Sequence, residues 1–534
     1  MKSLFAVLII LSLFVVIITG CAEKAPAGPA TTTAIPKEAT PAPPQQQYGG
    51  TLKILTNTIP SQIGYPAEIT TGTPMYGSSC PPIFDYLFYK TLDLRPTPGL
   101  VQTWEIAADK KSMVWHLKQG VKFHDGTDFN AEAVKYNLQA MAATPGGKGS
   151  FANVTSYDII DPYTIRVNLS QFSAILMSGT LASYMGFMAS PTAMKIPVTS
   201  ETAGLHMVGT GPFKFASFQR DVALRFEKWS GYYEKGKPYL DAIEIRKFAD
   251  YTTKLMAFKA GDGQYVSDIA SKDFAALKAA GFLINQFDYC SVLGLVPDSA
   301  NPDSPWSNLK VREAAQYAIN TQSIANNVFG EGTLGATQAA APKDPFYVSG
   351  LDRPYNPAKA KELLTQAGYP NGFKTTFYMD MTSQNAGDYT VVIQNYLKAV
   401  GIDVEIQLCD MPKLTALRTG GWKNGLVNGA SGFPGLSYFQ AAFAEFSRNN
   451  TNKSMARPAG LQVQIDTAIA EADDNKRLEM YKGLIKTLFD DCTYIPVYAQ
   501  YLTGAFAPEV HDAAYGKSTK GYWESQNTWL STKK

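Results

Sequence analysis

The stretch GVKFHDGTDFNAEAVKYN, residues 120–137, places a histidine beside an aspartate just ahead of a segment with helical periodicity. The dipeptide Asp125-Gly126 is typical of a turn, because glycine tolerates positive φ and aspartate hydrogen-bonds the nearby backbone. Asn130 is well placed as a helix N-cap. The stretch contains no serine, cysteine or second histidine. It therefore predicts that His124 and Asp125 form a structural turn rather than a catalytic dyad or a metal site.

The segment just before it, MVWHLKQGVKF (113–123), alternates apolar and polar residues on both sides of Gly120. Such alternation around a glycine predicts a β-hairpin that turns at Gly120. Similar patterns and capping signals recur along the chain and indicate an α/β protein. They predict strands at 208–218, 222–229 and 401–410 and capped helices at 308–320 and 356–370.

The chain has 534 residues, which exceeds one compact core and predicts two to four structural units. Hydrophobic residues make up 45% and charged residues 18%, as in ordinary globular proteins. The 48 basic and 46 acidic residues nearly balance, giving a formal charge of +2. This balance argues against a nucleic-acid-binding protein, which normally has a strongly basic surface.

The N-terminus is typical of a secretory signal. Lys2 precedes the apolar run 4–18, which only Ser12 interrupts. The run is shorter than the roughly 20 residues that a membrane-spanning helix needs. The first 20 residues are therefore predicted to be a signal peptide.

The four residues Ile18-Thr19-Gly20-Cys21 resemble a bacterial lipobox, which implies that a lipid is attached to Cys21. An ordinary cleaved signal with an incidental cysteine is the alternative. The lipidated cysteine would begin a Pro/Ala/Thr-rich segment, residues 21–47, that cannot bury enough apolar surface to fold and is predicted to be a disordered tether. These features predict an extracytoplasmic protein anchored to the cell membrane.

The remaining cysteines, Cys80, Cys290, Cys409 and Cys492, lie far apart and form no C-x-x-C pair. A zinc or redox centre is therefore not predicted. Disulfides are permitted outside the cytoplasm, and three pairings of four cysteines remain open.

The sequence lacks the common motifs of enzymes. The chain has four scattered histidines, no H-E-x-x-H, no G-x-S-x-G and no Walker A sequence, and Gly209-Thr210-Gly211-Pro212 lacks the remaining glycine of a dinucleotide loop. The sequence predicts no catalytic residue, no metal ligand and no cofactor.

Four motifs in order make the chain resemble the bacterial extracellular solute-binding proteins of family 5, the dipeptide, oligopeptide and nickel receptors of ABC importers. They are PTPGLVQTWEIAADKKSMVWHLKQGVKFHDGTDFNAEAVKYN (96–137), VGTGPFKFASF (208–218) with Trp229 and Tyr232-Tyr233 after it, NLKVREAAQYAIN (308–320) and YNPAKAKELLTQAGYP (355–370). The resemblance implies the type II periplasmic-binding-protein fold, with two lobes and an extra subdomain in lobe one. It also implies a monomer that binds a peptide or small molecule between the lobes and delivers it to ABC permease subunits.

The resemblance also implies boundaries for these parts. Lobe one would comprise residues 48–288 plus 502–534, with 81–204 as the extra subdomain, and lobe two residues 289–501. The chain would cross between the lobes near residues 288–292 and 498–501, and these two crossings would form the hinge.

One departure from the peptide receptors bears on the ligand. Many of them carry an acidic stretch in lobe two whose first aspartate holds the peptide's ammonium group, and this chain has Gly432-Phe433-Pro434-Gly435 there. A buried ammonium without a charged partner is strongly disfavoured. Nearby amide, hydroxyl and aromatic groups suit a neutral polar ligand instead. The expected ligand-binding residues are Trp422, Asn428, Ser431, Phe433 and Tyr438.

Several alternatives remain open at the level of sequence. Some of these aromatic residues could simply pack lobe two. The ligand could be a peptide or similar organic solute, an oligosaccharide or a metal chelate. A different class of protein, a secreted lipoprotein hydrolase, is also consistent with the N-terminus.

Overall fold

The computed structural model describes residues 45–65, 67, 80–197, 199, 201–381, 386–431, 452–513 and 523–532. Contacts divide the chain into residues 1–45 and 46–534, and every element below belongs to the second unit. The predicted signal peptide, Cys21 and residues 22–44 of the tether lie outside the described residues. No helix in the described ranges is both long and apolar enough to cross a membrane.

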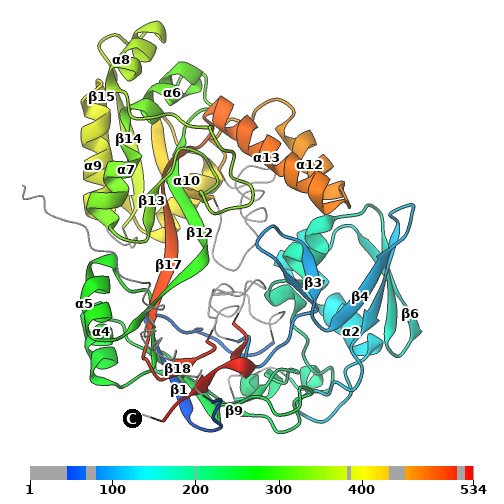
Figure 1. Cartoon of the computed structure of the whole chain (residues 1–534). Coiled ribbons are helices and arrows are strands. Elements are labelled where there is room, and N and C mark those ends of the chain that lie inside the picture. The colour runs from blue at the N-terminus through cyan, green and yellow to red at the C-terminus, as the bar shows by residue number, and fades with distance from the viewer. Residues whose placement is uncertain are drawn as a thin grey trace, which may run out of the picture. The chain divides into compact units, whose positions relative to one another are not determined.

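One mixed sheet of eleven strands runs through the described part of the second unit (Figure 1). Its order is β15-β14-β16-β12-β17-β11-β1-β10-β9-β8, and β13 pairs with β17 off this path. The bounds are β1 Thr51–Thr56, β8 Phe213–Gln219, β9 Ala223–Lys228, β10 Ala242–Lys247, β11 Tyr265–Ser267, β12 Leu283–Pro297, β13 Thr333–Gly335, β14 Phe373–Asp380, β15 Ile402–Cys409, β16 Gly425–Ser431 and β17 Ile495–Phe506.

Two long antiparallel strands, β12 and β17, join the two halves of this sheet. At one end β17 pairs with β11, and at the other end β12 pairs with β16. We call the part built on β1 and β8–β11 lobe one and the part built on β13–β16 lobe two. The register between β12 and β17 shifts between Gln286 and Cys290, at one of the two predicted chain crossings.

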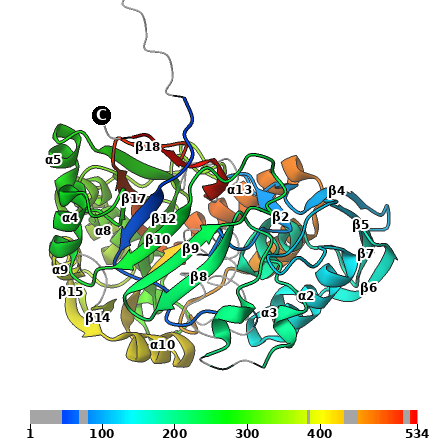
Figure 2. The same cartoon turned by 90° about the horizontal axis from the view of Figure 1, so that it is seen from below.

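Lobe one is built on parallel pairing of β1 with β10 and of β1 with β11, and Figure 2 shows β8, β9, β10 and β1 side by side. Two helices, α4 (Tyr251–Ala260) and α5 (Phe274–Ala279), pack on it. Asp250 caps α4, and Gly261 ends it with a φ of 87°, which glycine adopts without a steric cost. A glycine therefore ends this helix.

The extra subdomain contains a separate four-stranded sheet of order β4-β5-β7-β6. Asn130 caps the helix that follows, because its Oδ1 accepts from the backbone N–H of Ala133 at 3.0 Å, as predicted. Val134, Leu138 and Met141 of that helix are buried. The bounds are β4 Val101–Ile106, β5 Ser112–Leu117, β6 Val154–Asp161, β7 Thr164–Leu169, α2 Ala131–Ala143 and α3 Pro145–Ser150, and a small hairpin is formed by β2 Phe88–Lys90 and β3 Pro96–Pro98.

The hairpin predicted over residues 113–123 is wrong in its pairing. Strand β5 ends at Leu117 and pairs with β4 and β7. Val121 and Phe123 are buried, but the local pairing there is an isolated bridge between Lys122 and Asp128. The alternation predicted correctly which residues are buried. It did not predict that β5 pairs with β7, a strand about 50 residues further along the chain.

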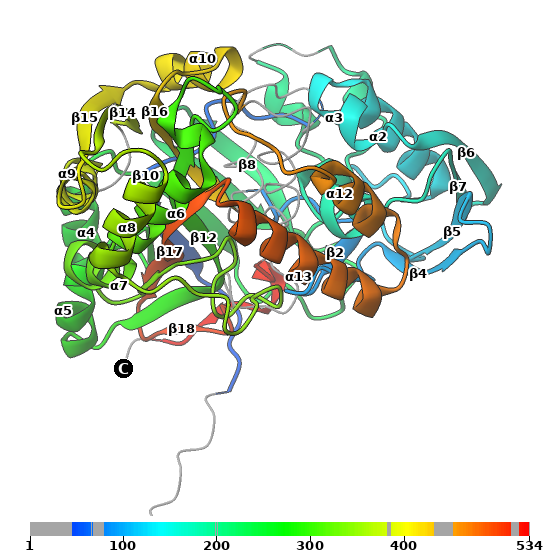
Figure 3. The same ribbon diagram turned by 90° about the horizontal axis from the view of Figure 1, so that it is seen from above.

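Lobe two carries most of the helices, which Figure 3 shows from above. Asn308 and Asn356 cap α6 and α8 through hydrogen bonds from Lys310 and Lys359, so both predicted N-caps are confirmed. The bounds are α6 Leu309–Ala318, α7 Thr321–Ile324, α8 Pro357–Gln366, α9 Ala386–Lys398, α10 Met411–Gly420, α12 Leu461–Ala470 and α13 Asp474–Asp491.

Candidate functional site

The His124-Asp125 pair is a turn, as predicted. Asp125 Oδ1 accepts from the backbone N–H of Thr127 at 3.0 Å, and Gly126 has a φ of 85°. His124 Nε2 donates to the carbonyl oxygen of Gly211 at 2.9 Å, since a carbonyl can only accept. Burial is the main cause that lowers the pKa of His124 to about 4. A neutral imidazole is thus fixed between the extra subdomain and lobe one.

The motif Gly209-Thr210-Gly211 lies at this junction. A Cβ on Gly209 would lie 2.1 Å from the carbonyl oxygen of Ile83, so the close approach of the two backbones requires glycine. Between the glycines, Thr210 Oγ1 donates to buried Asp85 at 3.0 Å. Burial is the main cause that raises the pKa of Asp85 to about 6. The paired glycines were the sequence signal for this junction, which sequence reasoning missed.

Trp422 is 3% exposed and belongs to the lobe-two core. Its Nε1 donates to the carbonyl oxygen of Gly425 at 3.1 Å, and its backbone N–H donates to Ser454 Oγ at 2.7 Å. The indole ring therefore packs inside lobe two. Packing was one of the two roles that the sequence allowed for the aromatic residues near position 430.

Asn428 lies on β16 opposite Leu295 of β12. Arg418 of α10 donates from Nη2 to the carbonyl oxygen of Asn428 at 2.5 Å. Asn428 Oδ1 and Arg418 Nε are both buried and have no hydrogen-bond partner in the described part of the chain. Two residues in hydrogen-bond contact thus retain an acceptor and a donor with unused hydrogen-bonding capacity. Nothing in the sequence had indicated Arg418.

The other expected ligand-binding residues are only partly described. Ser431 ends β16, where its backbone pairs with Val292 near the lobe crossing. Phe433 and Tyr438 lie outside the described residues, as does the stretch 432–435 in which the acidic residues are missing.

Within the described ranges, no three His, Cys, Asp or Glu side chains are close enough to hold a metal ion. The thiols of Cys409 and Cys492 are buried and free, so these two do not pair with each other, and Cys80 is also buried. Burial raises the pKa of the Cys492 thiol to about 12, which keeps it protonated and unreactive at neutral pH.

Lys90, the last residue of β2, carries a buried charge. The residue is 8% exposed, and its Nζ has no hydrogen-bond partner among the described residues. Desolvation lowers its pKa to about 8 from an ordinary 10.5. A base with a depressed folded pKa stabilises the fold fully above its unfolded pKa and loses that stability as pH falls through the folded value.

Lys90→Met should therefore raise the free energy of unfolding at pH 7 by about 1–3 kcal/mol, because the apolar stem is kept and the unpaired charge is removed. The gain should shrink as pH rises from 8 toward 10.5 and vanish above 10.5, where the lysine is neutral in the unfolded state as well. Urea denaturation at pH 7 and pH 10 measures this, with exposed Lys361→Met as the control. Equal stability of Lys90→Met and wild type at pH 7 would contradict the assignment of an unpaired buried ammonium.

Comparisons with known proteins give the chain's relatives. Glutathione-binding protein GsiB of Salmonella paratyphi A is 29% identical over 459 residues, which is 83% of this chain and 87% of the relative. GsiB of Escherichia coli O1:K1 is 29% identical over 447 residues, covering 81% of this chain and 84% of the relative.

Solved structures share the fold. The periplasmic binding protein DppA of Helicobacter pylori, in complex with the peptide STSA, matches with a TM-score of 0.72 and 23% identity over 91% of this chain and 98% of its own. The ABC transporter substrate-binding protein CtaP of Listeria monocytogenes matches with a TM-score of 0.78 and 18% identity over 91% and 100%. The two-lobed α/β periplasmic-binding-protein fold expected from sequence is thus confirmed.

A family model gives the remaining finding. It describes bacterial extracellular solute-binding proteins, family 5 Middle, and it matches residues 95–447, which include all four motifs named above in full. The match begins at the hairpin between β2 and β3, in the extra subdomain, and continues through the junction at Gly209-Thr210-Gly211. The chain belongs to the bacterial extracellular solute-binding proteins of family 5.

Proposed function

We propose that the chain is a lipid-anchored extracytoplasmic receptor that binds a peptide or similar small organic solute between its lobes and delivers it to an ABC permease. The observation that carries this proposal is the family match over residues 95–447. The sheet supports it, because β12 and β17 are the strands that join the two lobes and their register shifts between Gln286 and Cys290. A local loss of regular pairing is a suitable place for a hinge.

The same proposal makes Cys21 the lipid attachment site. Two acyl chains would hold the protein stably at the membrane, whereas one would bind marginally. Residues 21–47 would then be the tether between the membrane and the folded part of a monomeric receptor. The tether would let the receptor reach its permease. Radiolabelled fatty acid should be incorporated into the wild-type protein and not into Cys21→Ser.

Ligand choice follows from the chemistry around β16. The stretch 432–435 offers no carboxylate for an ammonium group. Asn428 Oδ1 and Arg418 Nε offer an acceptor and a donor that lack partners in the described structure. These groups support binding of a neutral or carboxylate-bearing organic solute through hydrogen bonds, with Phe433 and Tyr438 as stacking surfaces.

A thermal-shift panel tests the function. The probes are glutathione, the tetrapeptide Ser-Thr-Ser-Ala, a malto-oligosaccharide and a nickel–histidine chelate. One class should stabilise the protein saturably, by about 2.7 kcal/mol at a hundredfold excess over its dissociation constant. Stabilisation by the oligosaccharide or by the chelate alone would assign the ligand to that class instead of to the peptides. Chemical turnover of a bound probe would support a hydrolase.

The site residues are tested with the probe that binds. Asn428→Ala should weaken binding, because the amide is then lost from the ligand's surroundings. Thr415→Ala, on the exposed surface of α10, is the matched control and should leave binding unchanged. No response from any probe class would count against the receptor function.

A further inference from the structure

The hairpin formed by β2 and β3 ends in a tightly organised tip. The backbone N–H of Leu94 donates to the carbonyl oxygen of Thr91 at 3.0 Å, and the N–H of Arg95 donates to Thr91 Oγ1 at 3.1 Å. Arg95 Nε also forms an ion pair with Asp93 at 2.6 Å. The tip therefore presents its side chains in a fixed arrangement.

Leu94 at this tip has an unusual backbone. Its φ is 63°, in the left-handed region that disfavours residues with a bulky side chain. Its side chain is 5% exposed and belongs to the core of lobe two, although the hairpin is part of the extra subdomain. A strained residue persists where its surroundings hold it in place. Here the apolar contact with lobe two offsets the backbone strain.

Lobe two contributes to the same contact in return. Ala472, in the turn between α12 and α13, packs against the core of the extra subdomain. Arg95 Nη2 donates to Asn475 Oδ1 of α13 at 2.9 Å. Figure 1 shows the hairpin next to these two helices. The extra subdomain thus places Leu94 against the lobe-two core, and lobe two places Ala472 against the core of the extra subdomain. The hydrogen bond between Arg95 and Asn475 also joins the two parts.

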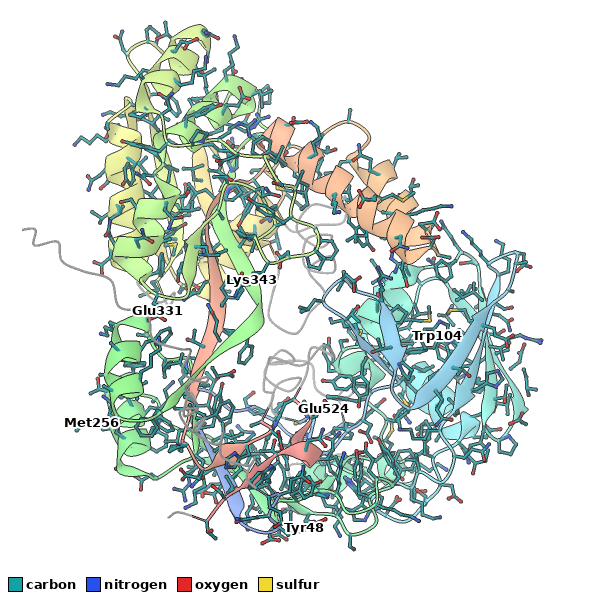
Figure 4. All side chains as sticks on the ribbon, in the orientation of Figure 1. Tyr48, Trp104, Met256, Glu331, Lys343 and Glu524 are labelled. Atoms are coloured by element: carbon teal, nitrogen blue, oxygen red, sulfur yellow. The ribbon has the colours of Figure 1, made fainter. Side chains whose placement is uncertain are left out.

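A second set of contacts between the lobes lies beside the joining strands. Gln286 Nε2 donates to the carbonyl oxygen of Gly332 at 3.3 Å, and Lys278 Nζ pairs with Glu331 at 2.7 Å. Figure 4 shows Glu331 on the side of β12 and β17 away from the hairpin. Rotation about β12 and β17 moves distant groups more than near ones. The hairpin contact must therefore separate when the lobes open.

We propose that the hairpin tip, through Leu94 and Arg95, is a latch that holds lobe two against the extra subdomain and stabilises the closed arrangement. The inference rests on the proposed function, in which the lobes open and close around a solute. Without the latch the closed state is less populated, and the apparent affinity for a solute falls by the same factor.

The test compares Leu94→Asn with Leu92→Asn. Asparagine tolerates the left-handed conformation, so the first variant keeps the tip while removing the apolar contact. Leu92 is 37% exposed on the same tip and does not belong to the lobe-two core cluster, so it carries the same substitution outside that cluster. Small-angle scattering of the probe-free protein should show a larger radius of gyration for Leu94→Asn and an unchanged one for Leu92→Asn.

Affinity gives the second readout. The dissociation constant of the probe that binds, from the four named above, should rise about tenfold or more in Leu94→Asn, because burial of a leucine side chain contributes at least that factor. It should stay unchanged in Leu92→Asn. Ala472→Asp, which places a charge at the half-buried reciprocal contact, should act as Leu94→Asn does, and it decides the matter if the leucine variant fails to fold.

Equal radii of gyration for wild type, Leu94→Asn and Ala472→Asp would overturn the latch. If the wild-type protein binds none of the probes, the proposed function is contradicted. The scattering comparison of the variants would still show whether the latch exists.

Discussion

Arg312→Ala is expected to lower the free energy of unfolding by about 3–5 kcal/mol, because it leaves several buried carbonyl groups without donors. Arg312 lies on α6 and is 4% exposed. Its Nη1 donates to the carbonyl oxygens of Trp306 and Ser307 at 2.9 and 2.8 Å. Nε and Nη2 donate to the carbonyl oxygen of Asp491 at 3.1 and 2.8 Å, which ties α6 to the end of α13.

Urea denaturation followed by tryptophan fluorescence measures this loss. Arg312→Lys should lie between wild type and alanine, since one ammonium cannot reach all three carbonyls in the geometry of the planar guanidinium. Lys310→Ala, on the exposed side of the same helix, should change stability by no more than about 0.5 kcal/mol. A loss below about 1 kcal/mol in Arg312→Ala would show that water satisfies these carbonyls.

The second large effect concerns the pH dependence of stability at the junction of His124 and Asp85. The pKa of His124 is about 4 in the fold against 6.5 ordinarily, so its stabilising contribution is complete above pH 6.5 and is lost as pH falls through 4. The pKa of Asp85 is about 6 against 3.8, so its contribution is complete below pH 3.8 and is lost as pH rises through 6. The two trends oppose each other in almost the same pH range.

Single substitutions should separate them. His124→Gln removes one trend, and stability relative to wild type should then fall by about 3 kcal/mol from pH 4 to pH 6.5. Asp85→Asn should show the opposite slope of similar size. Urea midpoints at half-unit pH steps provide the measurement, and all other carboxyl groups cancel in the comparison with wild type. Parallel profiles for the three proteins would mean that neither pKa is shifted by burial.

Local features of the fold could be predicted from the sequence. The caps at Asn130, Asn308 and Asn356 depend on residues within one helical turn, and the structure confirms each of them. The turn at Asp125-Gly126 is equally local. Such features succeed because the groups that satisfy them are a few residues away in the chain.

Features that depend on distant partners could not be predicted in the same way. The pairing of β5 with β7 required knowledge of a strand that comes about 50 residues later. The contact of the hairpin tip with lobe two joins residues 380 positions apart, since Arg95 donates to Asn475 of α13. No periodicity near Leu94 distinguishes it from exposed Leu92.

The expected ligand-binding residues show the same limit. Composition near residues 422–438 identified groups able to bind a solute, but it could not tell which of them face inward. Trp422 has its side chain in the lobe-two core, whereas Asn428 retains an unpartnered acceptor in the described structure. The environment of Trp422 includes residues far away in the chain, such as Ser454, which accepts a hydrogen bond from the Trp422 backbone N–H. The local sequence does not contain them.

Native mass spectrometry of the protein with the probe that stabilises it tests the central claim most directly. The account predicts one probe molecule per chain and, after hours of incubation and denaturation, recovery of that probe at its original mass. Absence of a one-to-one adduct with every probe class, or recovery of the probe as cleaved products, would contradict a receptor that binds its solute and releases it unchanged.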